Sequence, residues 1–183
     1  YNKEREVGAA LASVLGQRRL PCEVIVVDDG STDGGAEVVR RCASPLVRLV
    51  VQENAGVSAA RNRGAALARG AYLAFLDADD CWQPGYLEKI AFLIGRYPDC
   101  GAYAAAFDIV SGTKVHSNVH PQQEGIVPDF FREAMRSYIC QPSATVVPRT
   151  VFQELGGFPA GMKIGEDLHF WIRLASRYPV CFT

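Results

Sequence analysis

Along the first half of the chain, short continuous apolar runs alternate with longer segments whose apolar residues recur at helical spacing. Short apolar runs at 22–27, 46–51 and 72–76 indicate strands, and the first and third end in acidic residues. Apolar positions at helical spacing predict helices around these runs, at 3–17, from the turn after 33 to about 41, at 57–69 and at 84–97. This order predicts an α/β fold with a mostly parallel central sheet and helices on both faces.

The second half of the chain is less regular. We expect strands within 101–110 and 143–147 and helices at 149–155 and 166–177. Residues 113–128 are polar and contain Pro121, Gly125 and Pro128, which predicts a loop or lid.

The two ends of the chain are unusual for an α/β sheet. Tyr1 leads directly into a helix, where such a sheet normally opens with a strand, and a new apolar run begins at Val180. We therefore expect the first strand to be missing, and residues 1–183 to form a single domain of a longer chain.

Composition narrows the class of protein. With 49% hydrophobic and 21% charged residues in 183, the chain suits one globular domain. A net charge of −1 gives no basic footprint for nucleic acid, and no apolar run approaches the ~18 residues of a membrane span. Six cysteines stand far apart without a CxxC pair, which indicates reduced, mostly buried thiols of a cytoplasmic protein.

Acidic residues concentrate directly after two of the predicted strands. The two clusters are Asp28, Asp29 and Asp33, and Asp77, Asp79 and Asp80. In open parallel sheets ligands bind at the carboxyl ends of the strands, so both clusters are expected to face one site. Crowded carboxylates favour a hard divalent cation, Mn²⁺ or Mg²⁺, which uses one or two carboxylates together with substrate phosphates. The alternative is an acidic loop that only caps the helix after Pro84.

The same segments resemble a known family. Four stretches, in order along the chain, are similar to the successive motifs of family-2 glycosyltransferases: 26–33 (VVDDGSTD), 54–64 (NAGVSAARNRG), 75–80 (FLDADD) and 156–174, which contains GGF, GED and WIRL. The resemblance covers nearly the whole chain. It implies a GT-A (Rossmann-like) nucleotide-diphospho-sugar transferase fold, with nucleotide-sugar and metal binding in about 1–100 and acceptor binding in about 101–183.

The resemblance also implies an activity. A sugar moves from a nucleotide-diphosphate donor, most often a UDP-sugar, to an acceptor hydroxyl of a glycan or lipid-linked saccharide. The anomeric carbon is inverted and a divalent metal, Mn²⁺ or Mg²⁺, assists. Such an enzyme is expected in cell-wall or polysaccharide biosynthesis, in the cytoplasm or at the inner face of the membrane.

Donor-side roles follow from the matching positions. The resemblance implies that Asp29 holds the nucleotide base, with Asp28 nearby, and that Tyr1 packs on the base as the tail of the family's first-strand motif. It implies that Asp77 contacts the ribose. Arg61 stands at a position similar to the family's donor-side arginine, although an arginine on an exposed helix is more often simply solvated.

The resemblance makes Asp79 the metal ligand and Asp167 the catalytic base. A base must reach the acceptor hydroxyl from the face opposite the leaving group, and the first turn of a helix favours its negative charge. Glu166 is the rival base, and a plain acidic pair at a helix start is the alternative without function. Trp82, beside the acidic loop, is a candidate for stacking on a sugar ring.

Two rival functions and one rival site remain at this stage. A sugar-phosphate nucleotidyltransferase would carry a glycine-rich loop with a basic residue after the first strand, where this chain has YNKE. A catalytically silent nucleotide-sugar-binding module would have lost Asp79 or Asp167, and both are present. His116 and His120 have a spacing that zinc ligands sometimes show, but no cysteine lies near them in sequence.

Overall fold

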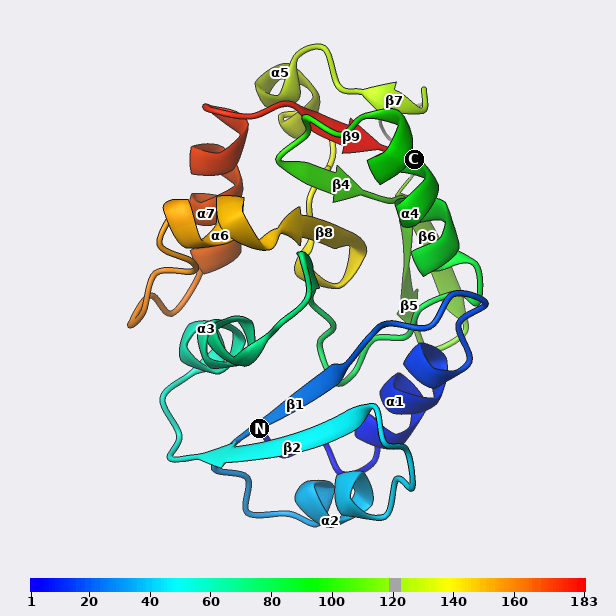
Figure 1. The fold of residues 1–183 in the computed structure, drawn as a ribbon, viewed down its shortest axis with the longest axis vertical. Helices are drawn as coiled ribbons and strands as arrows, with labels where there is room; N and C mark the ends of the chain where they lie inside the picture. Colours follow the sequence, from blue (N-terminus) through cyan, green and yellow to red (C-terminus); the bar gives the residue numbers. More distant parts are fainter. Residues whose placement is uncertain (119–122) are drawn as a thin grey trace.

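The computed structural model describes residues 1–118 and 123–183, which form an α/β fold of two sheets, each packed against helices, and a separate two-stranded hairpin (Figure 1). The helices are α1 Val7–Leu15, α2 Gly35–Arg40, α3 Val57–Leu67, α4 Tyr86–Arg96, α5 Phe130–Ala134, α6 Arg149–Glu154 and α7 Glu166–Ala175, with the 3-10 turn η1 Pro142–Ala144. The strands are β1 Val24–Asp29, β2 Val47–Gln52, β3 Tyr72–Ala74, β4 Ala102–Ala104, β5 Phe107–Ser111, β6 Lys114–Asn118, β7 Gly125–Ile126, β8 Thr145–Pro148 and β9 Val180–Phe182. Within these residues, no helix has the length and apolar character needed to cross a membrane.

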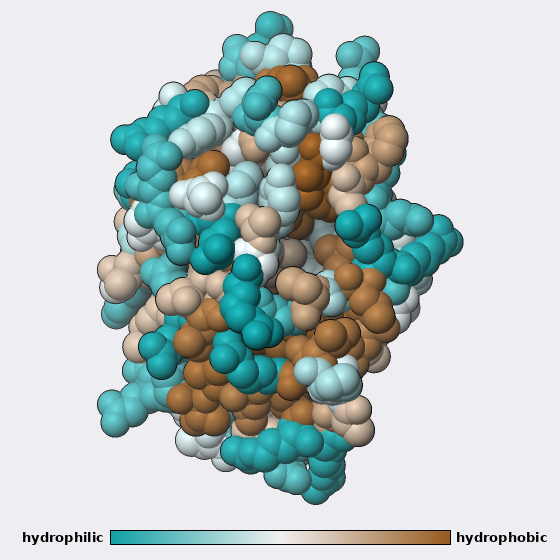
Figure 2. All heavy atoms as spheres, in the orientation of Figure 1, coloured by the Kyte–Doolittle hydropathy of each residue, from teal (hydrophilic) through white to brown (hydrophobic). Residues whose placement is uncertain are grey.

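Strands β1 and β2 form a parallel pair, as the sequence predicts. Their register places Val26 beside Leu49, and both pack with α1 and α2 around Val7, Leu11 and Val39. Helix α3 packs against β1 from the other side. Although helices pack on it, strand β1 is only half-buried from Val24 to Asp28. Apolar side chains gather over β1 and β2 in the lower part of Figure 2.

The second sheet has the strand order β3-β8-β4-β9-β7 and is mixed. Strand β8 runs antiparallel to both β3 and β4, β9 is parallel to β4, and β7 is antiparallel to β9. The α/β class is confirmed, whereas the expectation of a mostly parallel sheet is corrected here. Apolar runs such as those of β8 carry no information about direction, because either ladder satisfies the backbone.

The core lies on both faces of this second sheet. Aromatic side chains of α6, α7 and the segment before α7 pack together, with the Phe158 and Phe170 rings 5.0 Å apart and Trp171 against both. Helix α4 covers the other face through Ile90 and Leu93. Burial of these aromatic rings provides much of the apolar area that stabilises the fold.

The region expected as a loop or lid contains regular structure. A hairpin of β5 and β6 pairs Phe107 with Asn118, and β7 follows at Gly125. Strand β6 is exposed and mainly polar, so it shows no apolar period and the sequence pattern missed it. His116 lies on this exposed strand, and His120 of the proposed zinc pair lies outside the described residues.

All six cysteines are free thiols, as predicted. The expectation that most of them are buried is wrong: Cys100, Cys140 and Cys181 are buried, Cys42 is half-buried, and Cys22 and Cys81 are exposed. Burial raises the pKa of Cys140 to about 12, so this thiol stays protonated at neutral pH.

Candidate functional site

Arg61 of α3 joins two segments that are far apart in sequence. Its Nη2 donates to both carboxylate oxygens of Asp77 at 2.8 Å, and its Nη1 donates to Glu166 Oε1 at 3.2 Å. The guanidinium also lies over the Phe158 ring, 5.4 Å from the centroid. The side chains of Arg61 and Glu166 are only 11% and 13% exposed. The alternative of a solvated arginine is therefore wrong, because this face of α3 is covered by the segments around α7. Binding of the donor by Arg61 stays a prediction.

The loop after β3 is held by a residue from the reversed strand. The Asp77 N–H donates to Ser143 Oγ at 3.0 Å, and the Trp82 indole N–H donates to the Ser143 carbonyl at 2.6 Å. Ser143 lies in η1, directly before β8, so the antiparallel course of β8 brings it to the end of β3. No pattern in the sequence pointed to Ser143. The Trp82 ring packs on Tyr86 at 4.9 Å, and its stacking on a sugar stays a prediction.

Asp79 is the exposed acid of this loop. Its side chain is 47% exposed, and its Oδ2 lies 2.6 Å from Lys3 Nζ. The hydrogen bond and charge of Lys3 lower the pKa of Asp79 below its usual range. Sequence reasoning did not identify Lys3, although it directly follows the tail of the family's first-strand motif.

Asp79 could serve as one ligand of a metal ion whose other ligands come from the substrate and from water. No group of three or more histidine, cysteine, aspartate or glutamate side chains in 1–118 and 123–183 is arranged to hold a metal ion. A single exposed carboxylate does fit Mn²⁺ or Mg²⁺ when phosphate oxygens and water complete the shell. The ammonium of Lys3 at 2.6 Å shows that a cation is accommodated at this oxygen.

Asp29 is the most deeply buried acid of the site, at 4% exposed. Its carboxylate accepts hydrogen bonds from Gln52 Nε2 at 2.7 Å, from the Ala55 N–H at 2.9 Å and from the Gly56 N–H at 2.8 Å. The loop after β1 is thereby fixed to the loop before α3. Asp28 accepts a hydrogen bond from the Ser31 N–H at 3.1 Å. Base binding by either carboxylate stays a prediction.

Replacing Asp29 with Asn should destabilise the protein by about 1–3 kcal/mol at pH 7. Burial raises the pKa of Asp29, but the three hydrogen bonds outweigh it and the net pKa lies below its usual range. The ionised form therefore stabilises the fold fully above the unfolded pKa of ~3.9, and this contribution is lost as pH falls through the lower folded pKa.

Denaturant unfolding at several pH values measures this effect. The stability gap between wild type and Asp29→Asn should be largest at pH 7 and should shrink below about pH 4. Asp108→Asn is the matched control, because Asp108 is exposed on β5 and makes no side-chain hydrogen bond within the described residues. A gap that stays constant with pH would contradict the role given to the Asp29 carboxylate.

The N-terminal segment lies against the loop after β1. The Asn2 N–H donates to Ser31 Oγ at 2.9 Å, and Asn2 Oδ1 accepts from the Thr32 N–H at 2.8 Å. Tyr1, expected to pack on the base, is 57% exposed beside this contact and is free to meet a ligand. Its role in binding is untested by the structure and stays a prediction.

Asn62 connects α3 to the GGF segment. Its Nδ2 donates to the Phe158 carbonyl at 2.7 Å and its Oδ1 accepts from the Phe158 N–H at 2.9 Å. Gly157 has φ of +70°, and a Cβ there would lie 2.6 Å from Asn62 Oδ1. These contacts explain why asparagine follows Arg61 and why glycine precedes Phe158, a relation that sequence spacing did not reveal.

Glu166 and Asp167 begin α7 but have different environments. The Glu166 carboxylate forms the ion pair with Arg61 described above. Asp167 is half-buried, and its Oδ1 accepts a hydrogen bond from the Leu168 N–H at 2.7 Å. Asp167 forms no ion pair with any described residue, so its carboxylate is the one available to a ligand. This difference favours Asp167 over Glu166 as a base.

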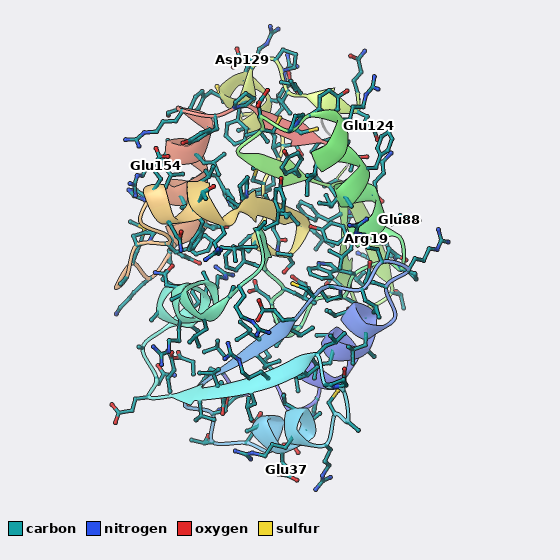
Figure 3. The ribbon with its side chains drawn as sticks, in the orientation of Figure 1. Arg19, Glu37, Glu88, Glu124, Asp129 and Glu154 are labelled. Atoms are coloured by element: carbon teal, nitrogen blue, oxygen red, sulfur yellow. The ribbon has the colours of Figure 1, made fainter. Side chains whose placement is uncertain are left out.

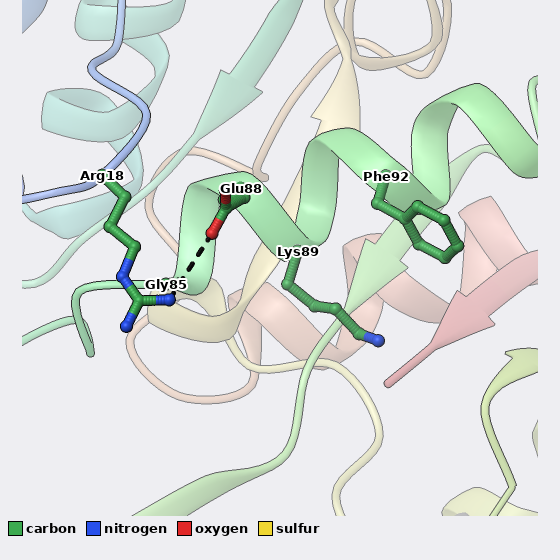
Figure 4. Close-up of a pocket in the computed structure, with 5 residues that line it drawn as sticks. All are labelled: Arg18, Gly85, Glu88, Lys89 and Phe92. Carbon is green, nitrogen blue, oxygen red and sulfur yellow. Dashed lines mark ion pairs between the residues drawn. The ribbon is translucent and has the colours of Figure 1, made fainter.

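Among the described residues, no other lysine or arginine forms ion pairs with two acidic side chains. The labelled charges in Figure 3 lie at the periphery and point outward: Arg19, Glu37, Glu88, Glu124, Asp129 and Glu154. A surface hollow of about 370 Å³ lies along α4, lined by Arg18, Gly85, Glu88, Lys89 and Phe92 (Figure 4). It contains none of the motif residues and is crossed by an exposed Arg18–Glu88 pair at 3.7 Å.

Comparison with known sequences finds a family model described as "Glycosyl transferase family 2", which matches residues 1–156. The putative teichuronic acid biosynthesis glycosyltransferase TuaG of Bacillus subtilis is 33% identical over 97% of this chain and 69% of its own length. An uncharacterized glycosyltransferase of Rickettsia felis is 32% identical over 97% of this chain. The match covers only 29% of the length of that protein. An uncharacterized glycosyltransferase of Nostoc is 41% identical over 49% of this chain, and this match also covers 29% of its length.

Comparison with solved structures finds the same fold. Staphylococcus aureus TarS 1–349 in complex with UDP-GlcNAc is 22% identical, with a TM-score of 0.86 over 100% of this chain and 53% of TarS 1–349. The mannosyltransferase PcManGT from Pyrobaculum calidifontis, in complex with GDP-Man and Mn²⁺, is 25% identical, with a TM-score of 0.73 over 100% of this chain and 54% of its own. The likeness to TarS confirms the GT-A fold expected from the motifs.

Proposed function

The chain belongs to glycosyl transferase family 2, and on this premise we propose that it transfers a sugar from a nucleotide-diphosphate donor to an acceptor hydroxyl with inversion at the anomeric carbon. The TarS and PcManGT structures hold UDP-GlcNAc and GDP-Man, which supports a nucleotide-sugar donor here. We propose a UDP-sugar as donor. The teichuronic acid role printed for TuaG supports a place in cell-wall or polysaccharide biosynthesis. We also propose a glycan or lipid-linked saccharide as acceptor, and action in the cytoplasm or at the inner face of the membrane.

The donor would bind between the loop after β1 and the loop after β3. Asp28 and Asp29 would hold the base, with Tyr1 packed on it, and Asp77 would contact the ribose. Arg61 fixes Asp77 through two hydrogen bonds of 2.8 Å, so one face of this carboxylate is already oriented before a donor arrives. We accordingly assign donor binding to about 1–100 and acceptor binding to about 101–183.

Asp79 would hold the divalent ion, Mn²⁺ or Mg²⁺. When bound, such an ion stabilises the charge that develops on the leaving diphosphate. The Asp79 side chain is 47% exposed and has no hydrogen-bond donor other than Lys3 among the described side chains, so it is accessible to the donor phosphates.

Asp167 would accept the proton of the acceptor hydroxyl as the hydroxyl oxygen attacks the anomeric carbon. Its position at the first turn of α7 favours the ionised carboxylate that a base requires. Phe170 and Trp171 on the same helix are fully buried and hold its orientation.

The observation that most supports this function is the Arg61 bridge. One guanidinium binds Asp77 of the acidic loop and Glu166, the neighbour of Asp167, with both partners within 3.2 Å. The bridge supports the proposal because it keeps the acidic loop, which would hold the donor, in contact with the first turn of α7, which would carry the base.

Nucleotide binding with a metal requirement tests the proposal. Thermal unfolding should be measured with UDP, GDP, dTDP and CDP, each with and without Mn²⁺. A nucleotide at ~100 times its Kd adds ~2.7 kcal/mol of stability, which should raise Tm by about 5–10 °C. We expect the shift with UDP and only when Mn²⁺ is present. No shift with any nucleotide would contradict the proposed function, and a shift with GDP alone would change the donor.

A further inference from the structure

Lys3 is held in place by hydrogen bonds on both sides of it. Asn2 has φ of +50°, a left-handed conformation, and its side chain and N–H bind Ser31 and Thr32. On the other side, the Glu4 N–H donates to Asp33 Oδ2 at 2.9 Å, and Glu4 Oε2 accepts from the Gly34 N–H at 3.1 Å. The backbone of Lys3 is thus fixed to the loop after β1.

From this position the Lys3 side chain reaches across to the acidic loop after β3. Its Nζ lies 2.6 Å from Asp79 Oδ2, although the two residues are 76 positions apart in sequence. Asp77 and Glu6 add negative potential at the ammonium. The side chains are 38% and 47% exposed, so the pair faces solvent and can open.

We propose that the Lys3 ammonium occupies the cation position at Asp79, so that a divalent ion must displace it and binds tightly only together with a nucleoside diphosphate. This inference rests on the proposed function. Asp79 cannot bind Lys3 and a hard cation through the same oxygen, and two cations near each other repel. The phosphates of a nucleotide supply negative charge to both, which removes the competition.

The charge of Lys3 determines by how much it weakens the binding of a divalent ion at Asp79. An exposed ion pair is weak, and a +1 charge a few ångströms from a divalent ion in high dielectric weakens ion binding only moderately. We expect replacement of Lys3 by Met, which keeps the length of the side chain and removes the charge, to tighten binding of Mn²⁺ alone about three- to tenfold.

Mn²⁺ titrations followed by electron paramagnetic resonance test the proposal without any turnover. Free Mn²⁺ gives a signal that is lost on binding, so affinity can be measured with Mn²⁺ alone and with saturating UDP or GDP. Lys3→Met should bind Mn²⁺ alone more tightly than wild type, and the strengthening of Mn²⁺ binding by nucleotide should shrink by the same factor. Lys3→Arg, which keeps the charge, should behave like wild type.

Two further variants make the result specific. Lys89→Met removes an ammonium from another exposed pair, Lys89–Glu124 at 2.5 Å, and should leave Mn²⁺ binding unchanged. Asp79→Asn should abolish Mn²⁺ binding with nucleotide. Unchanged Mn²⁺ affinity in Lys3→Met, together with nucleotide-dependent binding in wild type, would overturn this inference and leave the proposed function standing. Absence of Mn²⁺ binding in every protein, with either nucleotide, would overturn both.

Discussion

Replacing Asp167 with Asn should lower turnover of a nucleotide sugar about 10²- to 10⁴-fold, because the acceptor hydroxyl loses its base. Metal-dependent nucleotide binding should stay at the wild-type level. Within the described residues, the one hydrogen bond of the Asp167 side chain comes from the Leu168 N–H at 2.7 Å, and the amide oxygen of asparagine can keep it. The substitution therefore changes proton acceptance and leaves α7 in place.

The opposite pattern is expected for Asp79→Asn. Nucleotide binding in the presence of Mn²⁺ should be lost together with turnover, because Asp79 is the proposed metal ligand. The two variants are compared by thermal shift with nucleotide and Mn²⁺, and by release of nucleoside diphosphate from the donor. Equal loss of nucleotide binding in both would refute the separate roles given to the two aspartates.

Glu166→Gln separates the rival base from the proposed one. Glu166 pairs with Arg61 at 3.2 Å and its side chain is 13% exposed, so its loss should act mainly on stability. A fall in turnover as large as that of Asp167→Asn, with unchanged stability, would identify Glu166 as the base instead.

Replacing Arg61 with Met should destabilise the protein by about 2–4 kcal/mol and lower Tm by roughly 5–15 °C. The variant leaves the carboxylates of Asp77 and Glu166 without their cation, and breaking a fully buried pair typically costs ~3–5 kcal/mol. Asp77 is 33% exposed, so solvent screens its share and the expected value lies toward the lower end.

Arg63→Met is the matched control for this variant. Arg63 lies two residues further along α3, is exposed, and forms no ion pair within the described residues. Its replacement should change stability by less than ~0.5 kcal/mol. Urea unfolding of both variants measures the difference, and equal stabilities would show that the Arg61 bridge contributes nothing to the fold.

The double variant Arg61→Met with Glu166→Gln tests whether the two residues act as one unit. Removal of both charges should cost less than the sum of the single changes, because the Glu166 carboxylate is then no longer left without its cation and only Asp77 remains unpaired. Turnover should still fall, since Asp77 loses the two hydrogen bonds of 2.8 Å that orient it.

The sequence by itself determined the local elements and the positions of the acids. Short apolar runs and helical spacing of apolar residues located most strands and helices of the first half, with β1, α3 and α4 close to their expected bounds. Turn residues after β1 and β3 placed Asp29 and Asp77 at strand ends. These features depend on residues a few positions apart, which is the range over which periodicity and turn chemistry carry information.

Tertiary structure alone decided how these elements combine into a site. The reversed direction of β8 brings Ser143 to Asp77. The segments around α7 cover α3 and bury Arg61, which pairs with Asp77 and Glu166, and Lys3 of the N-terminal segment contacts Asp79. Arg61 and Glu166 are 105 positions apart, and Asn62 and Phe158 are 96 apart. Contacts over such separations form because packing of the whole core brings the elements together, so no local pattern of apolar or charged residues could have indicated them.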